Sequence, residues 1–369
     1  MTIYIISALC LLSFALLSEF GYFKTSKTAK AAFLSAGSLI LFFISAFRFD
    51  TGYDYRPYTN FFTRTISNTT AQLATLRFEK GYVFLNRYIQ LFVNDFQVLF
   101  IIISLIVIIL VYAILLKYCK NPSLGLLGFY LLGYYFVSMD LMRNLVAGLI
   151  VMYSYKYIKE KDFMRFIVIV LLASTFHLSA LVFIPFYFIL RLKFNYITFI
   201  VHTVVWGTLL VFSRPIMDFV TTYIYSSYDV ETSVTINTSV PLIDSIFPLI
   251  IFISIMLLGK ELEKDSDWTS MLLGAAYMET YFGLLGLKHM ILNRFALYFG
   301  PIVTLILVPN VIRISYNIIK NKSYENTVSK IRIYFCLLGT CVGGVGYFLY
   351  ALYNNYNGVI PHEWIWNVR

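Results

Sequence analysis

The sequence contains little charge and few histidines or cysteines for its 369 residues. Only 13% of the residues are Asp, Glu, Lys or Arg, about half the fraction of a soluble protein, whereas 59% are hydrophobic and the mean hydropathy is +0.76. This balance excludes a soluble globular chain. It predicts an all-α, polytopic integral membrane protein whose single membrane domain covers residues 1–369.

The motifs of several enzyme classes are also missing. The sequence has no Walker A motif, no Gly-rich dinucleotide fingerprint, no HExxH and no GxSxG. The four cysteines have no metal-ligand spacing and lie in or beside apolar runs, as small buried side chains do. Asp265 and Asp267 have the spacing of a metal-dependent sugar transferase, but the lysines before them favour a solvated turn. We therefore expect no cofactor, no metal site and no nucleic-acid partner.

Apolar stretches of helical length follow one another along the whole chain. About twelve candidate membrane spans are Ile3–Leu17, Ala31–Phe47, Phe96–Leu116, Leu124–Ser138, Leu141–Ile158, Phe163–Phe176, Leu178–Leu190, Tyr196–Phe212, Ile243–Leu258, Trp268–Leu287, Phe295–Ile312 and Ile331–Tyr350. Several are shorter than the roughly 20 residues that cross a hydrocarbon core of about 30 Å. We expect the short spans between 124 and 190 to end below the outer membrane surface, where they would form the floor of an outward-facing cavity.

The distribution of Lys and Arg predicts how these spans are oriented. A hairpin that turns near Thr175–His177 puts the basic clusters before and after 163–190 on the same, cytoplasmic side. With this hairpin, 18 of the 29 Lys and Arg face the cytoplasm, and both termini face outside. The outward set of nine Arg and two Lys opposes the positive-inside rule, so it requires a functional reason. Arginine is suited to forked contacts with phosphate.

The predicted outer segment 48–95 begins with a polar stretch, Arg48–Tyr58, directly after an apolar run. Asp50 and Asp54 lie in this stretch among arginines and tyrosines. A wet membrane boundary with tyrosines in the aromatic belt explains part of this composition. The mixture of acid, base and hydroxyl groups favours a functional site.

Further along this segment, residues 79–90 predict an interfacial helix that lies on the membrane, with the polar Asn86 and Gln90 away from its apolar face. The apolar face would contain Tyr82, Leu85 and Ile89. A second outer segment, 214–241, has a weak helical pattern. It is interpreted either as a lid or carbohydrate-contacting loop, or as a plain connector.

Three other outer turns carry basic side chains. Arg143 begins one short helix, with Asp140 just before it, and His177 lies at the hairpin turn. Arg294 begins another helix, with Lys288 shortly before it. A self-satisfied Asp140–Arg143 pair and a solvated turn histidine are the alternatives to a role in a site.

Six fragments resemble a known family when they are read in order. They are Arg48-x-x-x-Gly52-x-Asp54-Tyr55-x-x-Tyr58, Glu79-x-Gly81-Tyr82, Arg143 with Ala147, Phe176-His177-x-Ser179-Ala180, Arg294, and Pro361 near aromatic residues. Their order and spacing, over nearly the whole chain, resemble the EpsG family of Wzy-like polysaccharide polymerases. His362 departs from the pattern, because an aromatic residue is expected after Pro361.

This resemblance implies a multi-pass glycosyltransferase of the bacterial inner membrane whose active site faces the periplasm or cell exterior. It would transfer a growing glycan, with inversion, from undecaprenyl pyrophosphate to a carrier-linked repeat unit. The implied partners are an undecaprenyl-pyrophosphate-linked oligosaccharide, membrane lipid and a chain-length regulator protein. Cationic side chains could balance the charge of the leaving pyrophosphate in place of a metal.

The outward charges and the resemblance together assign roles to individual residues. The predicted substrate-binding residues are Arg48, Arg143 and Arg294 for pyrophosphate, together with Tyr55, Tyr58, Tyr82 and Lys288. The candidate bases for the acceptor hydroxyl are His177, Asp54 and Glu79. His177 leads because an imidazole with an ordinary pKa of ~6.5 is neutral near operating pH. Asp54 is expected to be a weaker base, since Arg48 or Arg56 nearby would favour its charged form.

Two other functions stay open. A ligase that moves finished glycan to another acceptor would use the same cavity and the same arginines. A transporter of lipid-linked sugar would need access from both faces and more often has two similar halves, which this sequence lacks.

Overall fold

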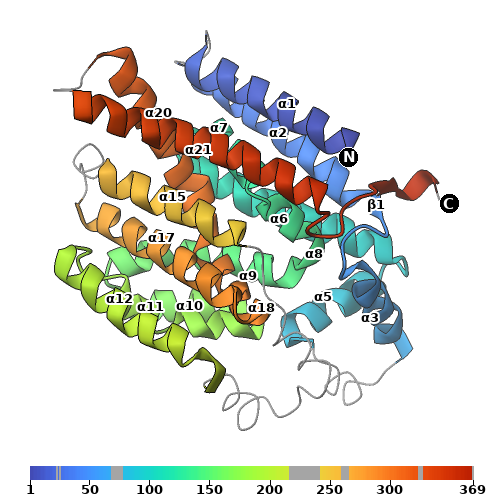
Figure 1. Cartoon of the computed structure of the whole chain (residues 1–369). Helices are drawn as coiled ribbons and strands as arrows, with labels where there is room; N and C mark the ends of the chain where they lie inside the picture. The colour runs from blue at the N-terminus through green and yellow to red at the C-terminus, as the bar shows by residue number, and fades with distance from the viewer. Residues whose placement is uncertain are drawn as a thin grey trace.

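The computed structural model describes residues 1–21, 24, 26–67, 78–215, 242–258, 266–322 and 327–367. These residues are almost entirely helical, as the composition predicts, and their longer helices run side by side in one bundle (Figure 1). Of the predicted outer loop 214–241, only Arg214 and Pro215 lie within the described residues.

The first half of the chain builds α1 (Thr2–Ala15), η1 (Leu16–Phe20), α2 (Lys27–Ala46), β1 (Arg48–Phe49), α3 (Tyr55–Ser67), α5 (Lys80–Gln90), α6 (Phe96–Tyr118), α7 (Pro122–Leu131), α8 (Tyr134–Asp140) and α9 (Met142–Lys159). The second half builds α10 (Phe163–Ser174), η3 (Leu178–Phe183), α11 (Phe186–Ile189), α12 (Tyr196–Val211), α15 (Ile243–Leu257), α17 (Ser266–Gly286), α18 (Met290–Asn293), η5 (Arg294–Tyr298), α19 (Gly300–Ile302), η6 (Val303–Leu307), α20 (Val308–Lys320), α21 (Thr327–Tyr353), β2 (Glu363–Trp364) and η7 (Ile365–Asn367).

Every predicted apolar stretch contains helix, but the expected count of about twelve spans is not confirmed. Five described helices are long and apolar enough to cross a membrane: α1 with η1, α2, α6, the run Gly300–Lys320, and α21. A sixth span results if α7 and α8 are counted together, although they bend by 58° at Gly133, whose φ is +81°. Four other apolar helical stretches, α10, η3 with α11, α12 and α15, have only 10 to 17 residues. Such lengths fall short of the ~20 residues that a spanning helix needs.

The core of the bundle is centred on α9, most of whose side chains are buried. It packs against α6, α8, α10, η3 and η5. Gly148 allows the closest of these contacts, because a Cβ there would lie 2.3 Å from the carbonyl oxygen of Leu297. This packing fixes the first turn of α9, which carries Arg143 and Asn144.

The hairpin expected near Thr175–His177 is present: α10 ends at Ser174, and η3 begins at Leu178 and packs back against it. The turn is tied to the start of α5, since the Gly81 N–H donates to the Thr175 carbonyl at 3.0 Å. The predicted cytoplasmic and outer sides of this hairpin stay predictions.

The interfacial stretch forms α5, but one residue lies on a different face from the one predicted. Asn86 is buried beside Tyr82 and Ile89, because its amide donates to the Tyr82 carbonyl at 2.7 Å and so satisfies a polar group inside the packed face. The exposed side carries Phe84 and Tyr88, whose rings stack 6.1 Å apart. An aromatic outer face suits a helix that lies on a membrane.

The two ends of the described chain meet at one end of the bundle. β1 pairs antiparallel with β2, with Arg48 opposite Trp364, and the Tyr4 hydroxyl donates to the Val359 carbonyl at 3.0 Å. Figure 1 places both termini, β1, α3 and α5 at this same end. We call it the β1 end. Termini on one side are the arrangement expected for an even number of crossings.

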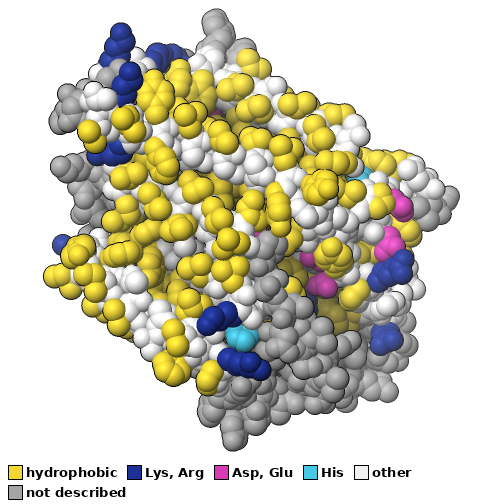
Figure 2. Space-filling model, in the orientation of Figure 1, with side chains coloured by type: hydrophobic (Ala, Val, Ile, Leu, Met, Phe, Trp, Pro, Cys, Tyr) yellow, Lys and Arg dark blue, Asp and Glu magenta, His cyan; other side chains and the backbone are white. Residues whose placement is uncertain are grey.

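The outside of the bundle is apolar, as a membrane surface requires. Figure 2 shows hydrophobic side chains over most of one face, with Lys and Arg gathered toward its ends. Large exposed side chains include Leu9, Ile109, Val204 and Val342 on four different helices. A continuous apolar surface of this extent would be unfavourable in water and is suited to contact with lipid.

Candidate active site

Glu79 connects three segments that are far apart in the sequence. It lies just before α5, and its carboxylate pairs with the Arg143 guanidinium at the start of α9. Its Oε1 lies 2.9 Å from His177 Nδ1 and accepts from the Leu178 N–H at 3.0 Å. We call Glu79, Arg143 and His177 the Glu79 cluster. All three side chains are largely buried but retain 15 to 20% exposure, so the cluster is open to the protein surface.

The charge of Glu79 determines which nitrogen of His177 carries the proton. Burial alone would raise the pKa of Glu79, but the hydrogen bond from His177 and the charge of Arg143 outweigh it and lower the pKa below its usual range. An ionised carboxylate only accepts hydrogen bonds, so a neutral His177 must hold its proton on Nδ1. Its Nε2 then has a free lone pair, and no described residue forms a hydrogen bond with that atom. In this tautomer, Nε2 of His177 is able to accept a proton.

Aromatic rings hold Arg143 in place. Its guanidinium carbon lies 4.5 Å from the ring centre of Phe78, 5.5 Å from that of Tyr82 and 5.9 Å from that of Tyr58. Each contact at this distance stabilises a cation through the quadrupole of the ring. Burial raises the pKa of Tyr58 to about 12, so this phenol stays neutral beside Arg143. Tyr58 and Tyr82 are buried and frame the arginine.

The alternative of a self-satisfied Asp140–Arg143 pair is wrong. Asp140 Oδ1 accepts from the Asp54 backbone N–H at 3.1 Å, and its Oδ2 accepts from the Asn357 amide at 3.4 Å. Arg143 turns instead to Glu79, which the hairpin contact at Gly81 brings to the start of α9. Arg143 is thus joined to the predicted site residues and not to its sequence neighbour.

Asp54 is a stronger base than the sequence suggested. Burial raises its pKa, and the charges of Arg294 and Arg143 lower it only part of the way back. The prediction that Arg48 or Arg56 would lower the pKa of Asp54 is wrong, because the charges that act on Asp54 are those of Arg294 and Arg143. Arg56 forms its ion pair with Asp50 at 2.6 Å. Asp54 therefore lies within electrostatic reach of two predicted site arginines.

Arg294 is a half-buried cation at the first residue of η5. Its side chain makes no hydrogen bond or ion pair with any residue that the structure describes, although its charge acts on Asp54 and Asp140. The Asn144 amide lies 3.4 Å from the Arg294 carbonyl and ties η5 to the start of α9. This arrangement leaves a guanidinium available beside the Glu79 cluster.

Arg48 is placed differently from the other two predicted pyrophosphate ligands. Its side chain is 0% exposed, and it donates to the carbonyls of Ser45, Thr51 at 3.3 Å and Met139 at 3.2 Å. The guanidinium also lies 4.7 Å from the centre of the Phe100 ring. Burial lowers the pKa of Arg48 to about 10, so it stays charged at neutral pH. Its donors hold the backbone at the junction of α2, β1 and α8.

Two other predicted substrate residues lie away from the Glu79 cluster. Tyr55 is buried and stacks on Phe100 at 4.4 Å. Lys288 is exposed, and its Nζ donates to the Leu210 carbonyl at 3.0 Å, near the end of α12. Their roles as substrate-binding residues stay predictions.

The sequence analysis missed the part that the tail plays in the site. Asn357 bonds Asp140, while the Gly52 N–H donates to the Gly358 carbonyl at 2.9 Å. Gly52 has φ of +100°, and a Cβ there would lie 2.6 Å from the Met139 carbonyl oxygen, so only glycine fits this close approach. The unexpected His362 lies 3.0 Å from the Tyr4 hydroxyl, which fixes the tail to α1.

The cavity expected above the short spans stays a prediction. One pocket among the described residues lies at the end of the bundle opposite β1, and another is lined by residues of α9 and α10 such as Tyr157 and Met164. Segments 68–77 and 216–241, which flank the predicted site in sequence, lie outside the described residues.

Comparison with known proteins gives one match. No curated protein and no solved structure matches the chain significantly. The EpsG family model matches residues 32–364, a range that includes the Glu79 cluster, Asp54 and Arg294. The chain therefore belongs to the EpsG family.

Proposed function

We propose that the Glu79 cluster is the catalytic site of a polysaccharide polymerase. Membership of the EpsG family implies a Wzy-like polysaccharide polymerase or a related function in glycan assembly, and the apolar helices make the protein a multi-pass membrane protein. The observation that carries the proposal is the Glu79 carboxylate that Arg143 and His177 share. It combines an oriented base with a cation in one partly exposed cluster.

In the proposed reaction, the donor is a glycan on undecaprenyl pyrophosphate and the acceptor is a carrier-linked repeat unit. The acceptor hydroxyl oxygen attacks the anomeric carbon, the bond from that carbon to the pyrophosphate oxygen breaks, and the configuration inverts. His177 Nε2 takes the hydroxyl proton, and the pyrophosphate leaves on its carrier. Glu79 holds the Nδ1–H of His177 and stabilises the imidazolium that forms.

The leaving pyrophosphate needs positive charge near the oxygen that it releases. Arg294 is assigned this role, because it has no ion pair among the described residues and its planar fork matches phosphate oxygens. Arg143 adds a second positive charge and is held in place by Glu79 and three aromatic rings. Such preorganised cations stabilise charge that develops in the transition state.

Asp54 is assigned to orient the acceptor sugar. Its raised pKa keeps it as the second candidate for the base. Arg48 is assigned the role of positioning the backbone near the site, since it donates to the carbonyls of Thr51 and Met139. Tyr58 and Tyr82 support Arg143, while Tyr55 and Lys288 stay proposed outer contacts of the substrate.

The outer orientation of the site is part of the proposal and rests on the distribution of Lys and Arg. Labelling of single cysteines tests this orientation directly. In a background without the native cysteines, a cysteine at position 177 should react with a membrane-impermeant reagent in spheroplasts. One at position 193 should not react.

The function is tested by the glycan profile of a deletion strain, complemented with the wild-type chain or with His177→Gln. The proposal predicts carrier capped with a single repeat unit in the deletion and in the His177→Gln strain, and polymer in the wild-type complement. Polymer that accumulates on the carrier would instead indicate a ligase. Repeat units retained on the cytoplasmic face would indicate a transporter.

A further inference from the structure

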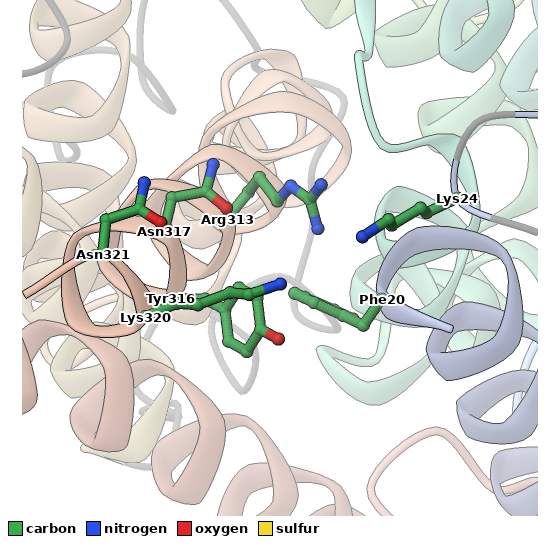
Figure 3. A pocket seen from close by; sticks show the side chains of 7 residues that line it. All are labelled: Phe20, Lys24, Arg313, Tyr316, Asn317, Lys320 and Asn321. Atoms are coloured by element: carbon green, nitrogen blue, oxygen red, sulfur yellow. The ribbon is translucent and has the colours of Figure 1, made fainter. Parts of the chain in front are cut away.

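A pocket of about 270 Å³ lies between η1 and the last turns of α20. Its lining residues are Phe20, Lys24, Arg313, Tyr316, Asn317, Lys320 and Asn321. Figure 3 shows the charged ends of Lys24, Arg313 and Lys320 pointing into one space from two sides. None of the described lining residues is acidic, so the pocket brings three positive side chains together with no carboxylate among them.

The aromatic residues of the pocket form a wall and position the arginine. The rings of Phe20 and Tyr316 meet edge to face at 4.6 Å, and the Arg313 guanidinium carbon lies 5.1 Å from the centre of the Phe20 ring. Arg313 also donates to the Glu19 carbonyl at 2.6 Å. The Glu19 carboxylate does not offset these charges, because it is buried and pairs with Lys30 at 2.7 Å.

The pocket lies at the opposite end of the bundle from the Glu79 cluster. Lys24 precedes α2 and Arg48 follows it, and a helix of 20 residues is about 30 Å long. This length matches the hydrocarbon core of a bilayer. The pocket therefore lies where a headgroup would lie if the β1 end is at the other membrane surface.

An apolar stripe leads from the middle of α1 to this pocket. Leu9, Leu12 and Leu16 are exposed and follow the three- and four-residue spacing of one helical face, which continues to Phe20. A lipid acyl chain can lie along such a stripe while its headgroup occupies the pocket. A soluble phosphate compound would make no use of it.

We propose that this pocket binds the phosphate of an anionic phospholipid headgroup. Arg313 makes a forked contact with the phosphate oxygens, and Lys24 and Lys320 add charge. Asn317 and Asn321 also line the pocket and offer neutral amides for the hydroxyl groups of a headgroup such as glycerol. The proposal is independent of the polymerase reaction, since none of these residues belongs to the Glu79 cluster.

The test compares lipid retention by the purified full-length protein and two double variants. Lys24→Gln with Lys320→Gln removes two pocket charges whose side chains make no hydrogen bond or ion pair with the described residues, so folding should be preserved. Lys161→Gln with Lys193→Gln is the matched control, with the same charge change at exposed sites outside the pocket. Retained phosphatidylglycerol and phosphatidylcholine are counted by native mass spectrometry, with glycerol phosphate as a soluble competitor.

The wild type and the control should retain phosphatidylglycerol in preference to phosphatidylcholine. The pocket variant should bind phosphatidylglycerol roughly 25-fold more weakly, since each lysine near a membrane surface contributes about fivefold. Glycerol phosphate should compete only at far higher concentration. Equal retention by the pocket variant and the control overturns the proposal, and so does displacement by glycerol phosphate at the concentration that suffices for the lipid. A monodisperse elution profile of each variant shows that a loss is not caused by unfolding.

Discussion

Arg48 and Arg143 were both predicted to bind pyrophosphate, but their surroundings differ. Arg48 is fully buried, and its partners are neutral carbonyls, the Met142 sulfur and an aromatic ring. Arg143 is 16% exposed and faces the carboxylate that also holds His177. An arginine that is fully buried and donates mainly to backbone carbonyls fixes the geometry of the chain around it. Arg143, which is partly exposed and shares a carboxylate with His177, is the arginine that we propose takes part in the reaction.

The comparison is tested most strongly by Arg48→Ala. Loss of the guanidinium leaves the carbonyls of Ser45, Thr51 and Met139 buried without this donor, which should lower the free energy of unfolding by about 3–5 kcal/mol. The protein that does fold should bind donor normally. Unfolding by SDS titration and donor binding by the folded fraction measure the two effects. If Arg48→Ala had normal stability and did not bind donor, Arg48 would be a pyrophosphate ligand, as the sequence predicted.

Arg143→Ala should act mainly on turnover. Removal of one partner from a buried charged contact costs about 2–5 kcal/mol, or roughly 30- to several-thousand-fold in activity. Arg143→Lys should restore only part of it, because lysine keeps the charge and loses the forked geometry. Arg56→Ala is the matched control, since Arg56 is 78% exposed and its ion pair with Asp50 should contribute little. Normal polymerisation by Arg143→Ala would place the site elsewhere.

Arg294→Ala should weaken the binding of donor and leave the stability of the fold almost unchanged. A contact to a charged phosphate contributes about 1.5–3 kcal/mol, so the Kd for donor should rise about 10- to 150-fold. Unfolding should change little, because Arg294 makes no ion pair with the described residues. Donor titration and a thermal unfolding curve on the same preparation check both points, with Arg56→Ala as the control, because Arg56 is exposed and has no proposed role in the site. A large loss of stability would show that Arg294 is structural, as Arg48 is.

Glu79→Gln should have the smallest effect on the free energy of unfolding, and this effect should depend on pH. The amide keeps hydrogen-bonding capacity and loses the charge, at a cost on the order of 1–2 kcal/mol near neutral pH. Because the pKa of Glu79 is lowered in the folded state, its contribution is full above the ordinary value of about 4.3 and is lost as the pH falls through the folded value. Unfolding curves of wild type and variant should therefore converge in acid. A difference that stays constant with pH would mean that Glu79 is not charged in the folded protein.

Much of the fold could be predicted from the sequence, because apolar runs of helical length dominate it. The helices, the hairpin before His177 and the helix after Glu79 all follow from local patterns. The number of spans could not be predicted, since a break such as Gly133 and the tight helical turns of η3 depend on packing against distant helices. The burial of Asn86 was not predicted, because its hydrogen bond to the Tyr82 carbonyl offsets the cost of burying a polar amide.

The residues of the candidate site could be proposed from the sequence, but the contacts between them could not. Glu79, Arg143 and His177 come from three segments, and nothing in their local sequence indicates that one carboxylate joins them. Arg48 and Arg143 also look alike in sequence, whereas burial and partner type separate them. The contribution of Asn357 had no local signal, because it depends on the tail returning to Asp140.

The most direct test of the central claim is in vitro polymerisation by purified His177→Gln and Asp54→Asn, with donor binding measured separately. His177→Gln should bind donor as the wild type does and lose about 10²- to 10⁴-fold in turnover, the contribution of a general base. Asp54→Asn should keep measurable polymerisation. Near-native turnover by His177→Gln, together with an Asp54→Asn protein that binds donor and makes no polymer, would contradict the account and make Asp54 the base.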